Sequence, residues 1–166
     1  MAYLVGIPLL ALLAILQSAV LSHLQLLDGR PDLVLLAVGS WGLVGRGREA
    51  MVWGLIGGLF LDLLSGIPFG TSAIGLVLVA YIASLLEGRF WEAHLLMPMG
   101  VTLLGSLVFH ALSLAGLLLS GHPIDLPTAL MRVILPSTFL NLILALPASQ
   151  LAVGLRRSLF PPEVTI

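Results

Sequence analysis

The sequence has little charge and lacks two residue types. Its 166 residues include no cysteine and no lysine, and charged residues make up only 9% of the chain. Without cysteine there is no disulfide, no thiolate nucleophile, no iron–sulfur cluster and no cysteine zinc site. A net charge of -1 offers no basic face to a nucleic acid. The composition therefore argues against nucleic-acid binding and cysteine-based redox chemistry.

Apolar residues dominate what is present. They make up 59% of the sequence, against about half in an average soluble domain. A membrane-spanning helix takes about 20 residues, so six spans and their connections would use the whole length. We predict an all-α polytopic membrane protein: a compact bundle of six transmembrane helices in one integral membrane domain, residues 1–166. The spans are expected at residues 3–21, 31–45, 50–65, 71–86, 95–120 and 133–155.

The second predicted span is short for a bilayer. It begins at Pro31, which suits a first helical turn, and ends near Gly45. At 1.5 Å per residue it would cover roughly 22 Å, so it must be tilted, lie in a thinned bilayer or be screened by neighbouring helices. A five-span chain without this helix, which would separate the two termini, is the alternative.

The distribution of arginine predicts the orientation, because cytoplasmic loops retain positive charge. In the six-span arrangement one side holds five arginines and the other side holds two. Both terminal segments lie on the side that holds five arginines, so both termini are expected in the cytoplasm. The five are Arg46, Arg48, Arg89, Arg156 and Arg157, and the two on the outer side are Arg30 and Arg132.

A carboxylate inside the third span needs a partner. Asp62 follows Gly57-Gly58-Leu59-Phe60-Leu61 near the predicted outer end, and an aspartate costs about 2.5 to 3.5 kcal/mol at a helix centre. One interpretation is a proton, ion or ligand site. The other is a latch, by which we mean an ion pair between helices, formed with Arg132 or Arg30; we favour the latch. Capping at the head of the second span accounts for Asp32. The predicted outer-side latch comprises Arg30, Asp32, Asp62 and Arg132.

Two further polar residues are expected between helices. Asn141 is predicted to make an interhelical hydrogen bond, worth about 1 kcal/mol. His110 and Ser113 lie three residues apart on one helix face, as a nucleophile and base or half a metal site would. No HExxH motif and no second histidine at ligand spacing accompany them. We predict no catalytic residue, no metal ligand and no cofactor.

Glycines are spaced for close helix packing in the second and third spans. Gly54 and Gly58 form a GxxxG pattern, and glycines recur every third residue from Gly39. Small residues let helix backbones approach, within one chain or between two proteins. The residues predicted to pack against a partner helix are Gly39, Gly42, Gly54, Gly57 and Gly58.

One region resembles a known family. It contains Arg30-Pro31-Asp32-Leu33-Val34-Leu35-Leu36, then Gly54-Leu55-Ile56-Gly57-Gly58-Leu59-Phe60-Leu61-Asp62, then Gly66, Gly70 and Tyr81. These motifs, over about residues 30–86, resemble the bacterial rod shape-determining protein MreD family. The resemblance implies a non-enzymatic subunit of the elongation machinery in the inner membrane, which supports side-wall peptidoglycan synthesis and cell shape. It implies helix-to-helix binding of MreC within the lipid bilayer and indirect links to MreB, RodA and a penicillin-binding protein.

A transporter subunit is the rival interpretation. The chain is similar in size and span number to the substrate-binding S components of energy-coupling-factor vitamin transporters. Those proteins dock through an Ala-x-x-x-Ala face on the first helix, whereas this sequence has Ala14-x-x-x-Ser18. An intramembrane hydrolase is a third alternative, which depends on His110 and Ser113 alone.

Overall fold

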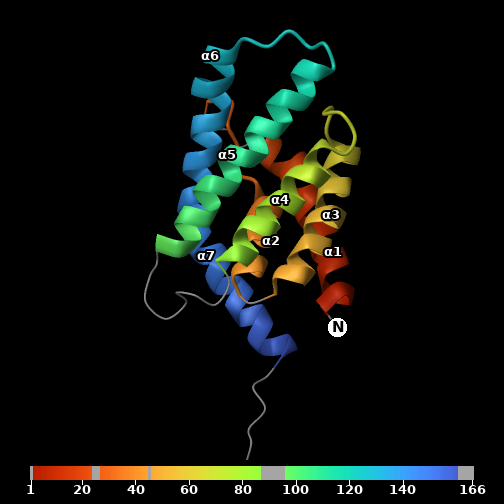
Figure 1. The fold of residues 1–166 in the computed structure, drawn as a ribbon, viewed down its shortest axis with the longest axis vertical. Coiled ribbons are helices and arrows are strands. Elements are labelled where there is room, and N and C mark those ends of the chain that lie inside the picture. The colour runs from red at the N-terminus through yellow and green to blue at the C-terminus, as the bar shows by residue number, and fades with distance from the viewer. Residues whose placement is uncertain (1, 24–26, 45, 87–95, 161–166) are drawn as a thin grey trace, which may run out of the picture.

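The computed structural model describes residues 2–23, 27–44, 46–86 and 96–160, and within these ranges the regular elements are all helices (Figure 1). The first helix, α1 (Ala2–Ile15), continues through a π-helical turn, η1 (Leu16–Val20), and a short 3₁₀ turn, η2 (Leu21–His23). Four single helices follow, and a composite helix ends the bundle. They are α2 (Leu33–Leu43), α3 (Gly47–Leu64), α4 (Thr71–Leu85), α5 (Leu96–Leu119), and α6 (Leu126–Thr128), which runs through η3 (Ala129–Ile134) into α7 (Leu135–Leu159). The predicted all-α class is confirmed.

The last helix begins earlier than the sequence predicts. The predicted span begins at residue 133, but one continuous helical stretch covers Leu126–Leu159, which is 34 residues. Pro127 lies in its first turn, where a proline costs nothing because the first N–H groups have no helical partner. Arg132 therefore lies within a helix.

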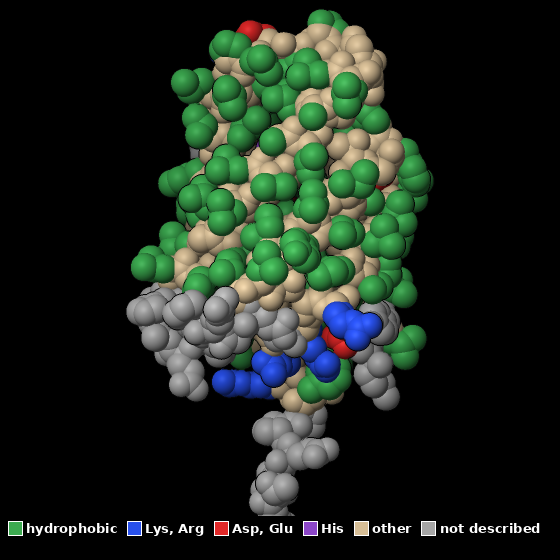
Figure 2. Space-filling view, in the orientation of Figure 1, with side chains coloured by type: hydrophobic (Ala, Val, Ile, Leu, Met, Phe, Trp, Pro, Cys, Tyr) green, Lys and Arg blue, Asp and Glu red, His purple; other side chains and the backbone are tan. Residues whose placement is uncertain are grey.

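Much of the described surface is apolar. Two helices, Leu96–Leu119 and Leu126–Leu159, are long and apolar enough to cross a membrane by length and composition. Three shorter apolar helices accompany them, Leu4–Val20, Leu33–Leu43 and Thr71–Leu85. Figure 2 shows apolar side chains over most of one face, with arginines gathered near the end where α7 finishes. Six complete transmembrane spans remain a prediction.

Both ends of the described chain lie at the same end of the bundle, called here the terminal end (Figure 1). The guanidinium carbon of Arg46, just before α3, lies 3.4 Å from the centroid of the Phe160 ring, just after α7. Arg156 and Arg157 occupy the last turn of α7. The opposite end, where α6 begins, is called the α6 end. Arg89 lies outside the described residues.

The short helix α2 lies at the centre of the bundle. Nine of its eleven residues are buried, and it contacts α1, α3, α4, α5 and α7. Trp41 of α2 stacks on Trp53 of α3, with ring centroids 4.5 Å apart. A helix of this length covers only about 17 Å. We predicted three ways to accommodate a short second span. The structure shows one of them, because neighbouring helices surround α2 and screen it.

The glycines of α3 bring it into close contact with α4. A Cβ added to Gly54 would lie 2.7 Å from the carbonyl oxygen of Leu76, and a Cβ on Gly58 would overlap the backbone of Ala73. Backbone atoms cannot rotate away as side chains do. These two positions therefore require glycine for packing within the chain.

The other predicted packing glycines also face this chain rather than a partner. Added Cβ atoms would lie 2.6 Å from Val34 at Gly57 and 2.7 Å from Ala83 at Gly42. At Gly39 the nearest atom, 3.7 Å away, belongs to Val79. Each of these glycines already has a neighbour inside the bundle, so packing within the chain, the first of the two alternatives, accounts for their spacing.

Candidate functional site

The carboxylate of Asp62 closes the start of α4. Its two oxygens accept hydrogen bonds from the backbone N–H groups of Gly70 at 2.8 Å, Ser72 at 2.9 Å and Ala73 at 3.3 Å. The first N–H groups of a helix have no partner within it, and the helix dipole favours a negative charge there. With 5% of its surface exposed, Asp62 thus acts as a cap supplied by α3 to α4.

This arrangement corrects the predicted latch. Asp62 is bonded to backbone N–H groups and not to Arg132 or Arg30. Arg132 instead lies 4.0 Å from Asp28, with both side chains more than half exposed. Three N–H donors already surround Asp62, so its charge needs no arginine.

An extended stretch, the 28–32 segment, lies along the last helix. Its backbone N–H groups at alternate residues each donate to that helix, as an extended chain allows because successive residues face opposite ways. The donors descend from the α6 end towards the middle of the bundle. The pairs are Asp28 N to Arg132 O at 3.1 Å, Arg30 N to Ser137 Oγ at 3.0 Å and Asp32 N to Asn141 Oδ1 at 2.7 Å.

Pro136 helps to make this contact. A proline has no N–H, so the carbonyl of Arg132, four residues earlier, lacks its usual helical donor. The N–H of Asp28 donates to that carbonyl. Gly29 allows the approach, because a Cβ there would lie 2.7 Å from both Pro136 Cβ and Ser137 N. The 28–32 segment therefore depends on a particular glycine and a particular proline.

Asp32 ends this segment with its side chain buried, 6% exposed. Its carboxylate accepts hydrogen bonds from Asn141 Nδ2 at 2.9 Å and from Gln17 Nε2 at 3.3 Å, and lies 3.6 Å from His110 Nε2. The side chain makes no capping bond to α2. The prediction that capping alone accounts for Asp32 was wrong, because three side chains from other helices engage the carboxylate.

The contacts of Asp32 place it near mid-depth. Asn141 lies near the middle of the last helix and also donates to Ser106 Oγ at 3.0 Å, near the middle of α5. Gln17 accepts a bond from Val34 N at 3.2 Å. The amide side chains of Asn141 and Gln17 thus satisfy polar groups at the buried start of α2.

His110 and Ser113 are each bonded to their own helix. The Nδ1 atom of His110 lies 2.7 Å from Ser106 O, and the Ser113 hydroxyl donates to Phe109 O at 2.9 Å. A serine whose proton is held by its own backbone is not positioned as a nucleophile. No group of three potential metal ligands occurs among the described residues.

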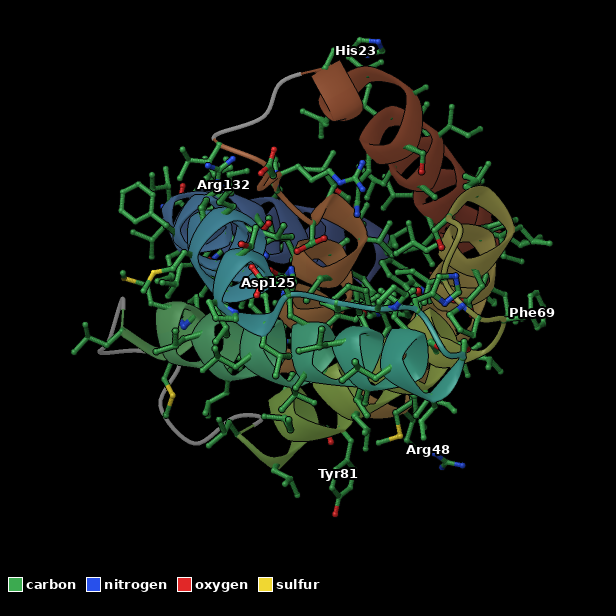
Figure 3. The ribbon with its side chains drawn as sticks, turned by 90° about the horizontal axis from the view of Figure 1, so that it is seen from above. His23, Arg48, Phe69, Tyr81, Asp125 and Arg132 are labelled. Carbon is green, nitrogen blue, oxygen red and sulfur yellow. The ribbon has the colours of Figure 1, made fainter. Side chains whose placement is uncertain are left out.

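A cavity of about 590 Å³ lies above this polar cluster. Asp32, His110 and Gln17 form its floor, and apolar side chains such as Leu61, Leu114 and Leu117 line its walls. Residues from both the loop after α3 and the start of η3 line it as well, so the cavity opens at the α6 end. Figure 3 looks down on this end, with Arg132 and Asp125 marking the side of the last helix.

Several residues of the site escaped the sequence analysis. Gln17 is a single amide in an apolar span, and that isolation was a usable signal. Pro136 interrupts a span and frees a carbonyl, which also marks a place where another segment binds. Gly29 and Ser137 gave no signal, because their role depends on contact between segments far apart in the sequence.

Comparisons with known proteins identify the family. The family model described as rod shape-determining protein MreD matches residues 1–152. No curated protein and no solved structure matches the chain. The family match does not support the transporter alternative, and the likeness to S components stays a prediction. The chain belongs to the family of the rod shape-determining protein MreD, the membrane-embedded components of the machinery that sets cell shape.

Proposed function

We propose that this chain is the multi-pass inner-membrane subunit that binds MreC and so supports side-wall peptidoglycan synthesis. The family match over residues 1–152 carries the proposal. Through MreC the chain would reach MreB filaments, RodA and a penicillin-binding protein. Its contribution is binding and positioning, without chemistry of its own.

The orientation follows from the charge distribution. Arg46, Arg156 and Arg157 lie at the terminal end, and positive charge is retained on the cytoplasmic side. Both termini are then cytoplasmic, and the cavity opens towards the periplasm.

We infer that a segment of MreC enters this cavity. The glycine faces of α2 and α3 are covered within the chain, so a partner helix has no access to them. MreC is expected to leave the membrane through one helix on the periplasmic side, at the level of the cavity mouth. Apolar walls with a few polar groups at the floor are typical of ligand-binding pockets, and we expect them to suit an ordered segment of a partner in the same way.

A cavity-filling substitution tests this proposal. Ser113 lines the cavity and bonds only to its own helix, so Ser113→Trp would fill the space without removing a contact between helices. The matched control is Leu104→Trp on the same helix, at a position that is 51% exposed and outside the cavity lining. We expect co-purification with MreC to be lost in Ser113→Trp and retained in Leu104→Trp. Equal co-purification of both variants would exclude the cavity.

Cross-linking provides a second test, because the chain has no cysteine of its own. Leu117→Cys, in the cavity wall, should cross-link to a cysteine placed just after the membrane helix of MreC. Leu104→Cys, on the exposed face of α5, should not. Cross-linking from Leu104→Cys alone would move the docking site to the outer surface of α5.

A further inference from the structure

Both ring nitrogens of His110 face acceptors. Nδ1 lies 2.7 Å from the carbonyl oxygen of Ser106, and Nε2 lies 3.6 Å from Oδ2 of Asp32. Neutral imidazole carries a hydrogen on one nitrogen only. In either neutral tautomer, one nitrogen therefore turns a lone pair towards an oxygen. The imidazolium form, with a hydrogen on each nitrogen, satisfies both contacts.

The shorter contact decides which nitrogen holds the permanent hydrogen. At 2.7 Å from Ser106 O, Nδ1 must donate, because two lone pairs repel at this distance. The exchangeable proton then belongs to Nε2, which faces the carboxylate. The other partners of Asp32, Asn141 and Gln17, are neutral amides, so they donate hydrogen bonds but do not cancel its charge.

Among the described residues, no other ionisable side chain forms an ion pair with Asp32 or His110. Asp28 and Arg30 line the cavity above the Asp32–His110 pair. Asp28 also lies within ion-pair distance of Arg132, and Asp62 is bonded to the start of α4. The elements packed around the pair contribute Gln17, Ser106 and Asn141, which are uncharged.

We propose that the Asp32–His110 pair is a proton-binding site that is reached from the α6 end through the cavity. His110 lines the cavity, and the two side chains keep 12% and 9% of their surface exposed. The proton passes from hydronium in the cavity to the Nε2 lone pair, leaving water, and the carboxylate keeps its charge. The net charge of the pair rises from −1 to 0, and release follows the reverse path.

Proton binding at this site acts on the 28–32 segment. With the proton in place, Asp32 is held by an ion pair as well as by its two amide donors. Without it, the Nε2 lone pair repels Oδ2, and the deep end of the segment is held less firmly. The site thus couples the proton concentration on one side of the membrane to the anchoring of a segment in the cavity wall, which goes beyond binding of MreC.

Nitrogen NMR of the histidine-labelled full chain in nanodiscs tests the proton assignment, with His110→Gln used to identify the signals. From alkaline to mildly acidic pH, we expect Nε2 to gain a proton while Nδ1 keeps its own. Loss of the proton from Nδ1, or an unchanged ring, would overturn the proposal. The nitrogen signals of His110 should differ between wild type and a folded Asp32→Asn variant, because the carboxylate that faces Nε2 is removed. Identical signals in the two proteins would dismiss Asp32 as the partner.

A second measurement leaves the pair intact. Ser113→Cys and Ser106→Cys are isosteric changes on α5. Ser113 lines the cavity, whereas Ser106 is outside the cavity lining and has no exposed surface. A membrane-impermeant thiol reagent, applied at the α6 end in oriented vesicles, should modify Ser113→Cys and leave Ser106→Cys unmodified. Protection of both would show that water does not enter the cavity, and equal modification would show that its floor is not closed. Either result would overturn the proposal that protons reach the Asp32–His110 pair from the α6 end through the cavity.

Discussion

Replacing Asp62 by alanine removes the acceptor for three backbone N–H groups at the start of α4. A hydrogen bond to a charged group contributes about 1.5 to 3 kcal/mol, and a buried donor left unpaired costs about 1 to 3 kcal/mol. The three bonds share one carboxylate, so their contributions are not additive. We expect Asp62→Ala to lower the free energy of unfolding by about 3 kcal/mol, above the usual loss for a single helix cap.

Reversible unfolding in mixed micelles, followed by circular dichroism while the SDS fraction rises, measures this loss. Asp28→Ala is the matched control, because Asp28 lies 4.0 Å from Arg132 and both side chains are more than half exposed. An exposed pair of this kind contributes less than about 1 kcal/mol. Asp62→Asn should fall between wild type and Asp62→Ala, since it keeps one acceptor oxygen but places an NH₂ group against N–H donors.

The result that refutes this reasoning is rescue by charge reversal. If Asp62 were paired with Arg132, the double variant Asp62→Arg with Arg132→Asp would recover the stability that Asp62→Arg loses. We expect no recovery, because an arginine at position 62 faces N–H donors whatever residue stands at position 132. Recovery would restore the ion-pair latch and remove the capping interpretation.

Two further predictions concern packing and the buried polar cluster. Gly58→Ala should destabilise the chain by about 1 to 3 kcal/mol, because its Cβ meets the fixed backbone of Ala73, whereas Gly100→Ala, with nothing within 4 Å, should not. The same micelle titration measures both, and equal stability would contradict the α3–α4 contact. Asn141→Leu should cost about 3 to 5 kcal/mol, because it leaves a buried carboxylate without its nearest donor; a thermal unfolding temperature equal to that of wild type would contradict this.

The sequence was sufficient to predict the helices. Long apolar runs interrupted by clusters of glycine, proline and charge correctly predicted the first five helices to within a few residues. The error came at Pro127, where one residue type is typical of two structures: a loop, or the first turn of a helix. The residues that pack around Pro127 decide between a loop and a helical turn. The start of the last helix therefore could not be predicted from the sequence.

The partners of the buried acids could not be predicted from residue types. A search for opposite charge finds Arg132 and Arg30, but the donors to Asp62 are backbone N–H groups, which every residue except proline carries. The depth of Asp32 was also hidden. Its position depends on how far the 28–32 segment descends along the last helix, and that distance has no signature in composition or spacing.

The shortness of α2 and the presence of the cavity have one cause. Irregular backbone at membrane depth is tolerated only where protein or a water-filled cavity surrounds it, and the 28–32 segment meets that condition by donating alternate N–H groups to the last helix. Because this segment runs from the α6 end to the level of Asn141 before any helix starts, α2 begins near the middle of the bundle. An extended chain is thinner than a helix, so the space beside it, between α1, α3 and α5, is left open as the cavity. A full-length second helix would fill that space, and it would remove both the polar floor and the opening in which we place the partner segment.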